Sequence, residues 1–219
     1  MPIVCIDAGH SYDTPGKRSP DGMKEYTFNK AAAIAAKKVL LQAGMTVLTP
    51  HRDDHDVPLT ARTDLANNGR ADLYVSIHAN AFGGSIWNGV QGIETYIHPH
   101  HSGEEKKLAQ MIHQHLIKSA KRPDRGIKTA DFHVLRETKM PAVLVECGFM
   151  TNRQEKQLLA SDSYRKTCGE AIAAGVLAYL RKTVQHTFYV QTGAFSKREN
   201  AEKQAAELKK AGFEAIIKS

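Results

Sequence analysis

Two histidines and two glutamates occupy positions from which their side chains could share one metal site. His10, His78 and Glu146 each stand at the carboxyl end of a short apolar segment that predicts a strand. In an open parallel sheet such strand ends share one crevice, so we expect these three side chains to lie close together. Glu25 begins the first long helix, on the same side of the sheet. The four residues therefore form one candidate site.

The ligand chemistry of this set is that of a catalytic zinc ion. Two imidazoles and a carboxylate, from His10, His78 and Glu25, can hold zinc and leave a fourth position for water. Glu146 would then remain to take a proton from that water, whose pKa the metal lowers toward about 7. Each residue alone also has a non-functional explanation. A histidine at a strand end is often a structural or surface residue, and the negative charge of Glu25 stabilises the first turn of a helix. Their convergence favours a hydrolase.

The elements that must position these residues alternate along the chain between apolar strands and helices. This alternation predicts an α/β fold with a mainly parallel twisted sheet and helices on both faces. We expect strands over residues 3–6, 45–49, 73–79, 93–98 and 142–147, and helices over residues 24–43, 58–68, 102–119 and 164–181. Asn152 and Glu155 predict a capping box for one more helix. Residues 120–131 are basic and turn-like, and residues 133–136 can extend.

The pattern restarts near the C-terminus, so we expect a catalytic domain over residues 1–182 and a small βαβ unit over residues 187–219. The elements of this unit would be a strand over 188–193, a helix over 197–211 with Ser196 and Glu199 as its capping box, and a strand over 213–217. A unit of this length is too small to bury its own sheet face. It could dock on the catalytic domain, or it could be one half of a longer repeat whose second half has been lost by truncation. Alternatively, a second copy of the chain could cover it, which would make a homodimer through residues 187–219.

The composition is that of a globular protein with an excess of positive charge. The chain has 219 residues, 42% of them hydrophobic and 24% charged, and a formal net charge of +7. Collagen-like, low-complexity and disordered proteins are thereby excluded. The charge favours a polyanionic partner, which could be nucleic acid, anionic lipid or a bacterial wall polymer. The glycines of residues 83–92 lack the spacing of a nucleotide-binding loop and favour a flexible rim for a substrate groove. We expect no nucleic acid partner.

Neither a membrane span nor a disulfide framework is expected. No run approaches 18 apolar residues, and the first residues lack the basic and apolar regions of an export signal. The three cysteines, Cys5, Cys147 and Cys168, form no CxxC pair. Cys5 and Cys147 lie in strands that could be neighbours, and we expect both to be reduced core thiols.

The remaining histidines carry less weight as ligands. His98, His100 and His101 could suggest a second metal site, but a histidine-rich loop of this size is more often exposed to solvent. His113 and His115 are two residues apart and cannot share a helix face, so we expect both at the surface.

Five blocks of residues resemble, in order, the zinc-dependent N-acetylmuramoyl-L-alanine amidases of the amidase_3 type. They are Ile6-Asp7-Ala8-Gly9-His10, Glu25, Leu59-Thr60-Ala61-Arg62-Thr63 with Ala66-Asn67, Ser76-Ile77-His78-Ala79-Asn80, and Val145-Glu146-Cys147-Gly148-Phe149. The resemblance covers residues 2–182. The block over residues 129–136 is also similar, with Asp131 where several members carry Asn, and Cys147 stands where some have Asn.

The resemblance implies a cell-wall hydrolase that cuts the amide between the lactyl group of N-acetylmuramic acid and L-alanine in peptidoglycan. It makes His10, Glu25 and His78 the ligands of one zinc ion per chain and Glu146 the catalytic carboxylate. Two rivals remain open: a zinc peptidase that cuts within the stem peptide, and a non-catalytic peptidoglycan-binding protein.

The C-terminal unit is similar to the first half of SPOR repeats, which bind peptidoglycan. The similarity runs from Phe188 to Ala201, and a full SPOR domain resembles two such βαβ halves. We further expect an enzyme made in the cytoplasm without a signal peptide, which acts on the wall after release through a phage holin pore or by mother-cell lysis. The sequence does not separate these two routes.

Overall fold

The structure is a computed structural model that describes residues 1–100, 102–183, 193–213, 215 and 217. The chain divides into two compact units, Met1–Val184 and Gln185–Ser219. Within the described residues, no helix is both long enough and apolar enough to cross a bilayer.

A six-stranded sheet with the order β2-β1-β3-β6-β4-β5 forms the centre of the first unit. Every neighbouring pair is parallel except β4 with β6, so the predicted mainly parallel α/β fold is confirmed. The strands are β1 Ile3–Ala8, β2 Thr46–Leu48, β3 Leu73–Asn80, β4 Ile93–Ile97, β5 Asp124–Thr129 and β6 Ala142–Phe149.

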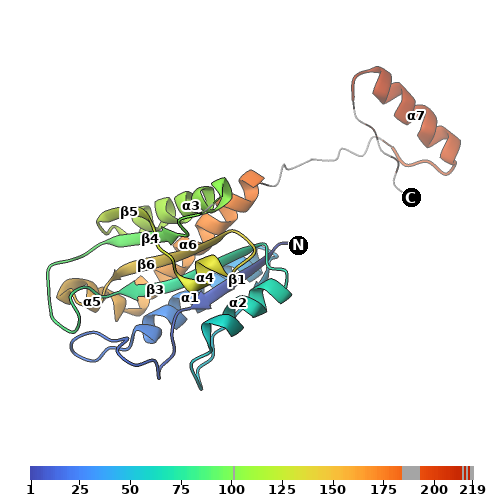
Figure 1. Cartoon of the computed structure of the whole chain (residues 1–219). Coiled ribbons are helices and arrows are strands. Elements are labelled where there is room, and N and C mark those ends of the chain that lie inside the picture. Colours follow the sequence, from blue (N-terminus) through green and yellow to red (C-terminus); the bar gives the residue numbers. More distant parts are fainter. Residues whose placement is uncertain (101, 184–192, 214, 216, 218–219) are drawn as a thin grey trace. The chain divides into compact units, whose positions relative to one another are not determined.

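Helices cover both faces of this sheet, as the sequence predicts (Figure 1). The helices are α1 Glu25–Gln42, α2 Leu59–Asn68, α3 Gly103–Ala120, α4 His133–Arg136, α5 Arg153–Leu159 and α6 Asp162–Thr183. Helices α1, α3 and α6 enclose the larger apolar core on one face. Helices α2 and α4 cover a smaller apolar cluster on the other face.

The alternation of side chains along β3 decides which residues reach the candidate site. Val75 and Ile77 point into the larger core. Since successive side chains of a strand point to opposite faces, Tyr74, Ser76 and His78 share the other face. Of these three side chains, His78 lies nearest the carboxyl end of β3, where the candidate site is expected.

Two predicted segments are wrong in type. Residues 124–129 form the edge strand β5 instead of a turn, and residues 133–136 form the short helix α4 instead of an extended segment. As an edge strand, β5 carries exposed and half-buried side chains, so its sequence lacks the apolar run that marks a buried strand. In α4 the helical turn buries Val134 and Leu135 against the smaller cluster, which overrides the extended preference.

The capping boxes also differ from the prediction. Asn152 caps α5 by accepting from the backbone N–H groups of Gln154 and Glu155. Glu155 does not complete a box with Asn152, because its carboxylate accepts from the backbone N–H groups of Gly92 and Phe149. A complete box is instead formed at the start of α3.

Cys5 and Cys147 are buried and free, as expected of core thiols, and Cys168 is buried and free as well. The strands of Cys5 and Cys147 are not neighbours, because β3 lies between β1 and β6.

The second unit contains helix α7, Arg198–Lys210. The predicted capping box is wrong, because Lys197 is the N-cap and makes no capping hydrogen bond through its side chain. The helix begins one residue later than a Ser196 cap would require, which moves Glu199 out of the position that could reach back to the cap. The strand expected over residues 188–193 falls mostly outside the described residues, and the strand expected over 213–217 includes positions 214 and 216, which also lie outside them.

Candidate active site

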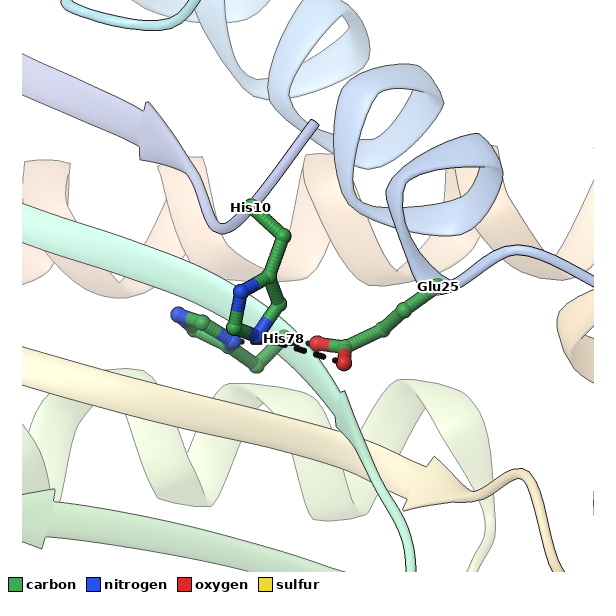
Figure 2. Close-up of side chains that lie close together, drawn as sticks. All are labelled: His10, Glu25 and His78. Atoms are coloured by element: carbon green, nitrogen blue, oxygen red, sulfur yellow. Dashed lines mark hydrogen bonds and ion pairs between the residues drawn. The ribbon is translucent and has the colours of Figure 1, made fainter. Parts of the chain in front are cut away.

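His10, Glu25 and His78 come from three elements and meet at one point. His10 follows β1, Glu25 is the first residue of α1, and His78 lies near the end of β3. One ligand atom from each lies within 4.8 Å of the others. Figure 2 shows both imidazole rings directed toward the Glu25 carboxylate, with 3.3 Å from His10 Nε2 to Oε2 and 3.0 Å from His78 Nδ1 to Oε1. The structure therefore brings together the predicted ligand set.

The backbone around Gly9 makes this approach feasible. A Cβ atom at Gly9 would lie 2.0 Å from Cε1 of His78, so only glycine leaves room for the ring. His10 adopts φ of 64°, in the left-handed region. Asn29 Nδ2 donates to Gly9 O at 2.9 Å and to Glu25 Oε1 at 3.0 Å, which ties the loop after β1 to the first turn of α1.

The charges of the cluster suit a cation. Burial lowers the pKa of His10 to about 4, against the attraction of Glu25, so this ring is neutral near pH 7. Burial opposes ionisation of Glu25, but the hydrogen bond and the charge of His78 hold the pKa of Glu25 below its usual range. Burial likewise opposes protonation of His78, but the hydrogen bond and charge of Glu25 raise the pKa of His78. A neutral imidazole and an ionised carboxylate are the forms that bind metals.

Glu146 lies beside this cluster on β6, where it pairs in register with His78 of β3. Burial raises the pKa of Glu146 to about 8, with the charge of His78 opposing and those of Glu25 and Glu94 adding to the shift. Its Oε2 atom is buried and finds no hydrogen-bond partner among the described residues. A carboxyl group with a pKa near neutrality and a free oxygen can accept and return a proton.

A cavity of about 340 Å³ is lined by the three candidate ligands, His10, Glu25 and His78, and by Glu146. Lys17 of the loop before α1 and Phe132 and His133 at the start of α4 contribute to its wall. His133 Nε2 is a second buried atom without a hydrogen-bond partner in the part of the chain that the structure describes. The cavity thus offers unpaired polar atoms near the histidines and the glutamates.

Arg62 is a structural residue of the site whose role the sequence analysis did not assign. Its guanidinium is 1% exposed and donates to Asp7 Oδ1 at 2.6 Å, to Ala8 O at 2.8 Å and to His10 O at 2.8 Å. Helix α2 thereby holds the end of β1 and the backbone of His10. The sequence did contain a signal for Arg62, because this residue belongs to one of the five blocks that resemble the amidase family. Such a resemblance does not say what a side chain contacts.

Glu94 is a second residue that the sequence did not single out. It is buried on β4, opposite Glu146 of β6 in the sheet register. Its carboxylate accepts from Tyr96 Oη at 2.6 Å and Arg125 Nε at 2.6 Å, and also from Lys128. These partners hold the pKa of Glu94 below its usual range although burial opposes its ionisation.

Among the described residues, no other histidine joins the cluster. His98 is half-buried and bonds Asp131 at 3.3 Å, His100 is exposed, and His101 lies outside the described residues. The prediction that His113 is a surface residue is wrong, because its ring is buried between Thr95 Oγ1 at 2.9 Å and Asp124 Oδ1 at 2.8 Å. The strand β5, missed at the sequence level, supplies that second partner.

Comparison with known proteins identifies the class of this fold and site. The chain belongs to the Amidase_3 family, N-acetylmuramoyl-L-alanine amidase, whose family model matches residues 4–178. A SPOR domain model matches residues 185–219. The resemblance of the sequence to both is thereby confirmed.

Particular relatives extend over nearly the whole chain. The chain is 35% identical over 221 residues to the N-acetylmuramoyl-L-alanine amidase CwlM of Bacillus licheniformis, covering 99% of this chain and 85% of that protein. It is 35% identical over 222 residues to the sporulation-specific N-acetylmuramoyl-L-alanine amidase of Bacillus subtilis, covering 99% and 84%. Among solved structures, the catalytic domain of CwlV from Bacillus (Paenibacillus) polymyxa matches with a TM-score of 0.75 at 35% identity, covering 82% of this chain and 98% of that one.

Proposed function

We propose that this chain is a zinc-dependent N-acetylmuramoyl-L-alanine amidase that hydrolyses the amide between the lactyl group of N-acetylmuramic acid and L-alanine. The observation that carries the proposal is the cluster of His10, Glu25 and His78, whose ligand atoms lie within 4.8 Å of one another beside the free oxygen of Glu146. Membership of the amidase family supplies the substrate class.

The donor set fits one zinc ion. Two imidazole nitrogens and one carboxylate oxygen are the ligands of a catalytic zinc site that keeps an open position. The buried and unpaired Oε2 of Glu146 is the group expected beside such a position. When bound, zinc supplies a Lewis acid that polarises the scissile carbonyl and acidifies water.

The chain's own residues would perform the remaining steps. Glu146 would accept a proton from the attacking water at Oε2 and pass it to the leaving amine of L-alanine. Asn29 and the backbone of Gly9 would keep Glu25 in place. The cavity wall formed by Phe132 and His133 would limit the water around the reacting amide.

Mass analysis of fragments from digested sacculi tests this function. The amidase predicts free lactyl carboxylates and intact peptides that begin with L-alanine. Stem peptides cut internally would instead indicate the zinc peptidase, and no released fragment would indicate the non-catalytic wall-binding protein. Either of these outcomes would overturn the proposal.

We also propose that the SPOR-type unit binds the peptidoglycan on which the catalytic unit acts. A tethered binding module raises the effective concentration of an enzyme on a repeating polymer. Removal of residues 185–219 is expected to reduce co-sedimentation with sacculi, and unchanged co-sedimentation would contradict this role.

Release by lysis remains part of the proposal. A sporulation-specific amidase and the endolysin of Bacillus phage SPP1 are both among the relatives, which is compatible with either mother-cell lysis or a phage holin pore. Expression timing in the source cell, during sporulation or late in phage growth, would separate the two routes.

A further inference from the structure

A chain of buried polar groups extends from the candidate zinc ligands into the sheet. Tyr74, Ser76 and His78 share one face of β3, and Asp7 of β1 pairs in register with Ser76. Asp7 Oδ2 lies 2.8 Å from Tyr74 Oη and 2.9 Å from Ser76 Oγ. Ser76 Oγ in turn lies 3.1 Å from Nε2 of His78. Tyr74 and Ser76 are fully buried and Asp7 is 1% exposed, so water does not compete for these bonds.

The direction of each hydrogen bond follows from the charge on Asp7. The buried guanidinium of Arg62 donates to Asp7 Oδ1 at 2.6 Å, which keeps the carboxylate ionised. An ionised carboxylate can only accept hydrogen bonds. The hydroxyl groups of Tyr74 and Ser76 must therefore both donate to Oδ2.

This direction decides the protons on the histidine. A serine hydroxyl has one proton, and Ser76 uses it on Asp7. Ser76 Oγ can then only accept from His78, so the proton of this bond belongs to Nε2. The other nitrogen of His78, Nδ1, lies 3.0 Å from Glu25 Oε1 and donates to that ionised carboxylate, so the Nδ1 proton is the one that would leave when zinc binds.

We propose that Ser76, oriented by Asp7, is a positioning residue that keeps the proton of His78 on Nε2 and so reserves Nδ1 for zinc. The proposal rests on the proposed function, because it assumes that His78 is a zinc ligand. A hydrogen bond at the second nitrogen fixes both the tautomer and the ring orientation of a metal-binding histidine. The absence of a Cβ at Gly9, whose place lies 2.2 Å from Nε2, allows the ring to reach this hydroxyl.

The chain offers a matched pair of variants. Ser76→Ala and Tyr74→Phe each remove one buried hydroxyl that donates to Oδ2 of Asp7, and both positions lie on the same face of β3. A purely structural role predicts similar effects of the two changes on metal binding. In the proposed role only Ser76→Ala acts on His78, because the structure gives Tyr74 no hydrogen bond with that ring.

Zinc affinity of the full chain, measured by competition with a chromophoric chelator, tests the difference. Ser76→Ala is expected to weaken zinc binding by roughly 10- to 100-fold, the usual effect of removing such an outer partner. Tyr74→Phe is expected to bind zinc as the wild type does. Equal affinity in both variants, whether retained or lost, would overturn the proposal. Thermal denaturation of the zinc-free proteins shows whether each variant is folded.

Nitrogen NMR of the histidine rings provides a readout that does not depend on activity. In the zinc-loaded wild type, His78 should carry a slowly exchanging proton on Nε2. In the Ser76→Ala protein, that proton should exchange rapidly. A proton found on Nδ1 with Nε2 bare would overturn the proposal. If the wild type binds no zinc at all, the proposed function fails instead, and the two failures are thus distinguishable.

Discussion

At the scale of single residues, the site combines a neutral imidazole and an ionised carboxylate with one buried carboxylate oxygen that has no hydrogen-bond partner among the described residues. His10 is neutral, Glu25 is ionised, and Glu146 keeps an unpaired buried oxygen within the described residues. A buried polar atom without a partner costs free energy, so its presence in a cavity indicates a functional role more than a stabilising one.

Loss of either histidine should abolish zinc binding. His10→Ala and His78→Ala each leave two protein ligands, which is too few for a catalytic zinc site. Metal analysis of the purified variants should find zinc well below one ion per chain, whereas the exposed His100→Ala control should match the wild type. Stoichiometric zinc in both ligand variants would refute the assignment.

Glu146→Gln should retain zinc and fold but lose turnover by roughly 10²- to 10⁴-fold, the usual effect of losing a general base. The amide has nearly the shape of the carboxyl group but cannot accept the proton of water. Turnover on purified cell walls is the measurement, with Glu170→Gln on the exposed surface of α6 as the control. Near-normal turnover would show that another group carries the proton.

At the scale of elements, the site depends on how α2 is attached to the end of β1. Arg62 of α2 donates to the carboxylate of Asp7 and to the carbonyl oxygens of Ala8 and His10. This one side chain joins the last two residues of β1, and His10 of the loop that follows, to helix α2. The backbone of His10 is thereby fixed before any metal binds.

Arg62→Met should destabilise the catalytic unit by about 3–5 kcal/mol, because Asp7 would be left as a buried charge without its ionic partner. Urea unfolding measures the change. Arg52→Met is the control, since the Arg52–Asp54 pair is exposed on both sides and such pairs contribute about 0–1 kcal/mol. A loss no larger than that of the control would show that the Arg62 contacts are not stabilising.

At the scale of the whole molecule, a unit that matches the amidase family model is followed along the chain by a unit that matches the SPOR model. The catalytic unit buries two apolar clusters of its own. In contrast, α7 of the second unit contains no buried residue. Within the described part of this unit, helix α7 therefore contributes no buried apolar face to a core.

We predict that two copies of residues 187–219 associate and make the full chain a homodimer. Two βαβ units joined at their strand edges would cover the apolar faces that one unit leaves exposed. Sedimentation of the full chain should give a dimer at micromolar concentration, and a chain ending at Lys182 should give a monomer. Two monomers would show that the unit is completed in another way.

Much of the site followed from local pattern. The apolar segments before His10 and His78 marked the strand ends, and parallel strands bring such ends to one edge of a sheet. That geometry predicted that His10 and His78, which are 68 positions apart in the sequence, lie close together. In the structure their ligand atoms lie beside that of Glu25. The capping residue Asn152 was also found by its local signal, because a cap bonds only to its own helix.

The sequence by itself determined the α/β class, the order of most elements and the residues of the candidate site, because the periodicity of apolar side chains is a local property. Only the tertiary structure decided that β5 forms, that Arg62 and Ser76 contact Asp7, and that one oxygen of Glu146 has no hydrogen-bond partner in the described part of the chain. Arg62 and Asp7 are 55 positions apart, and Ser76 and Asp7 are 69 apart. Contacts at such separations depend on how strands and helices pack, and no local pattern records them.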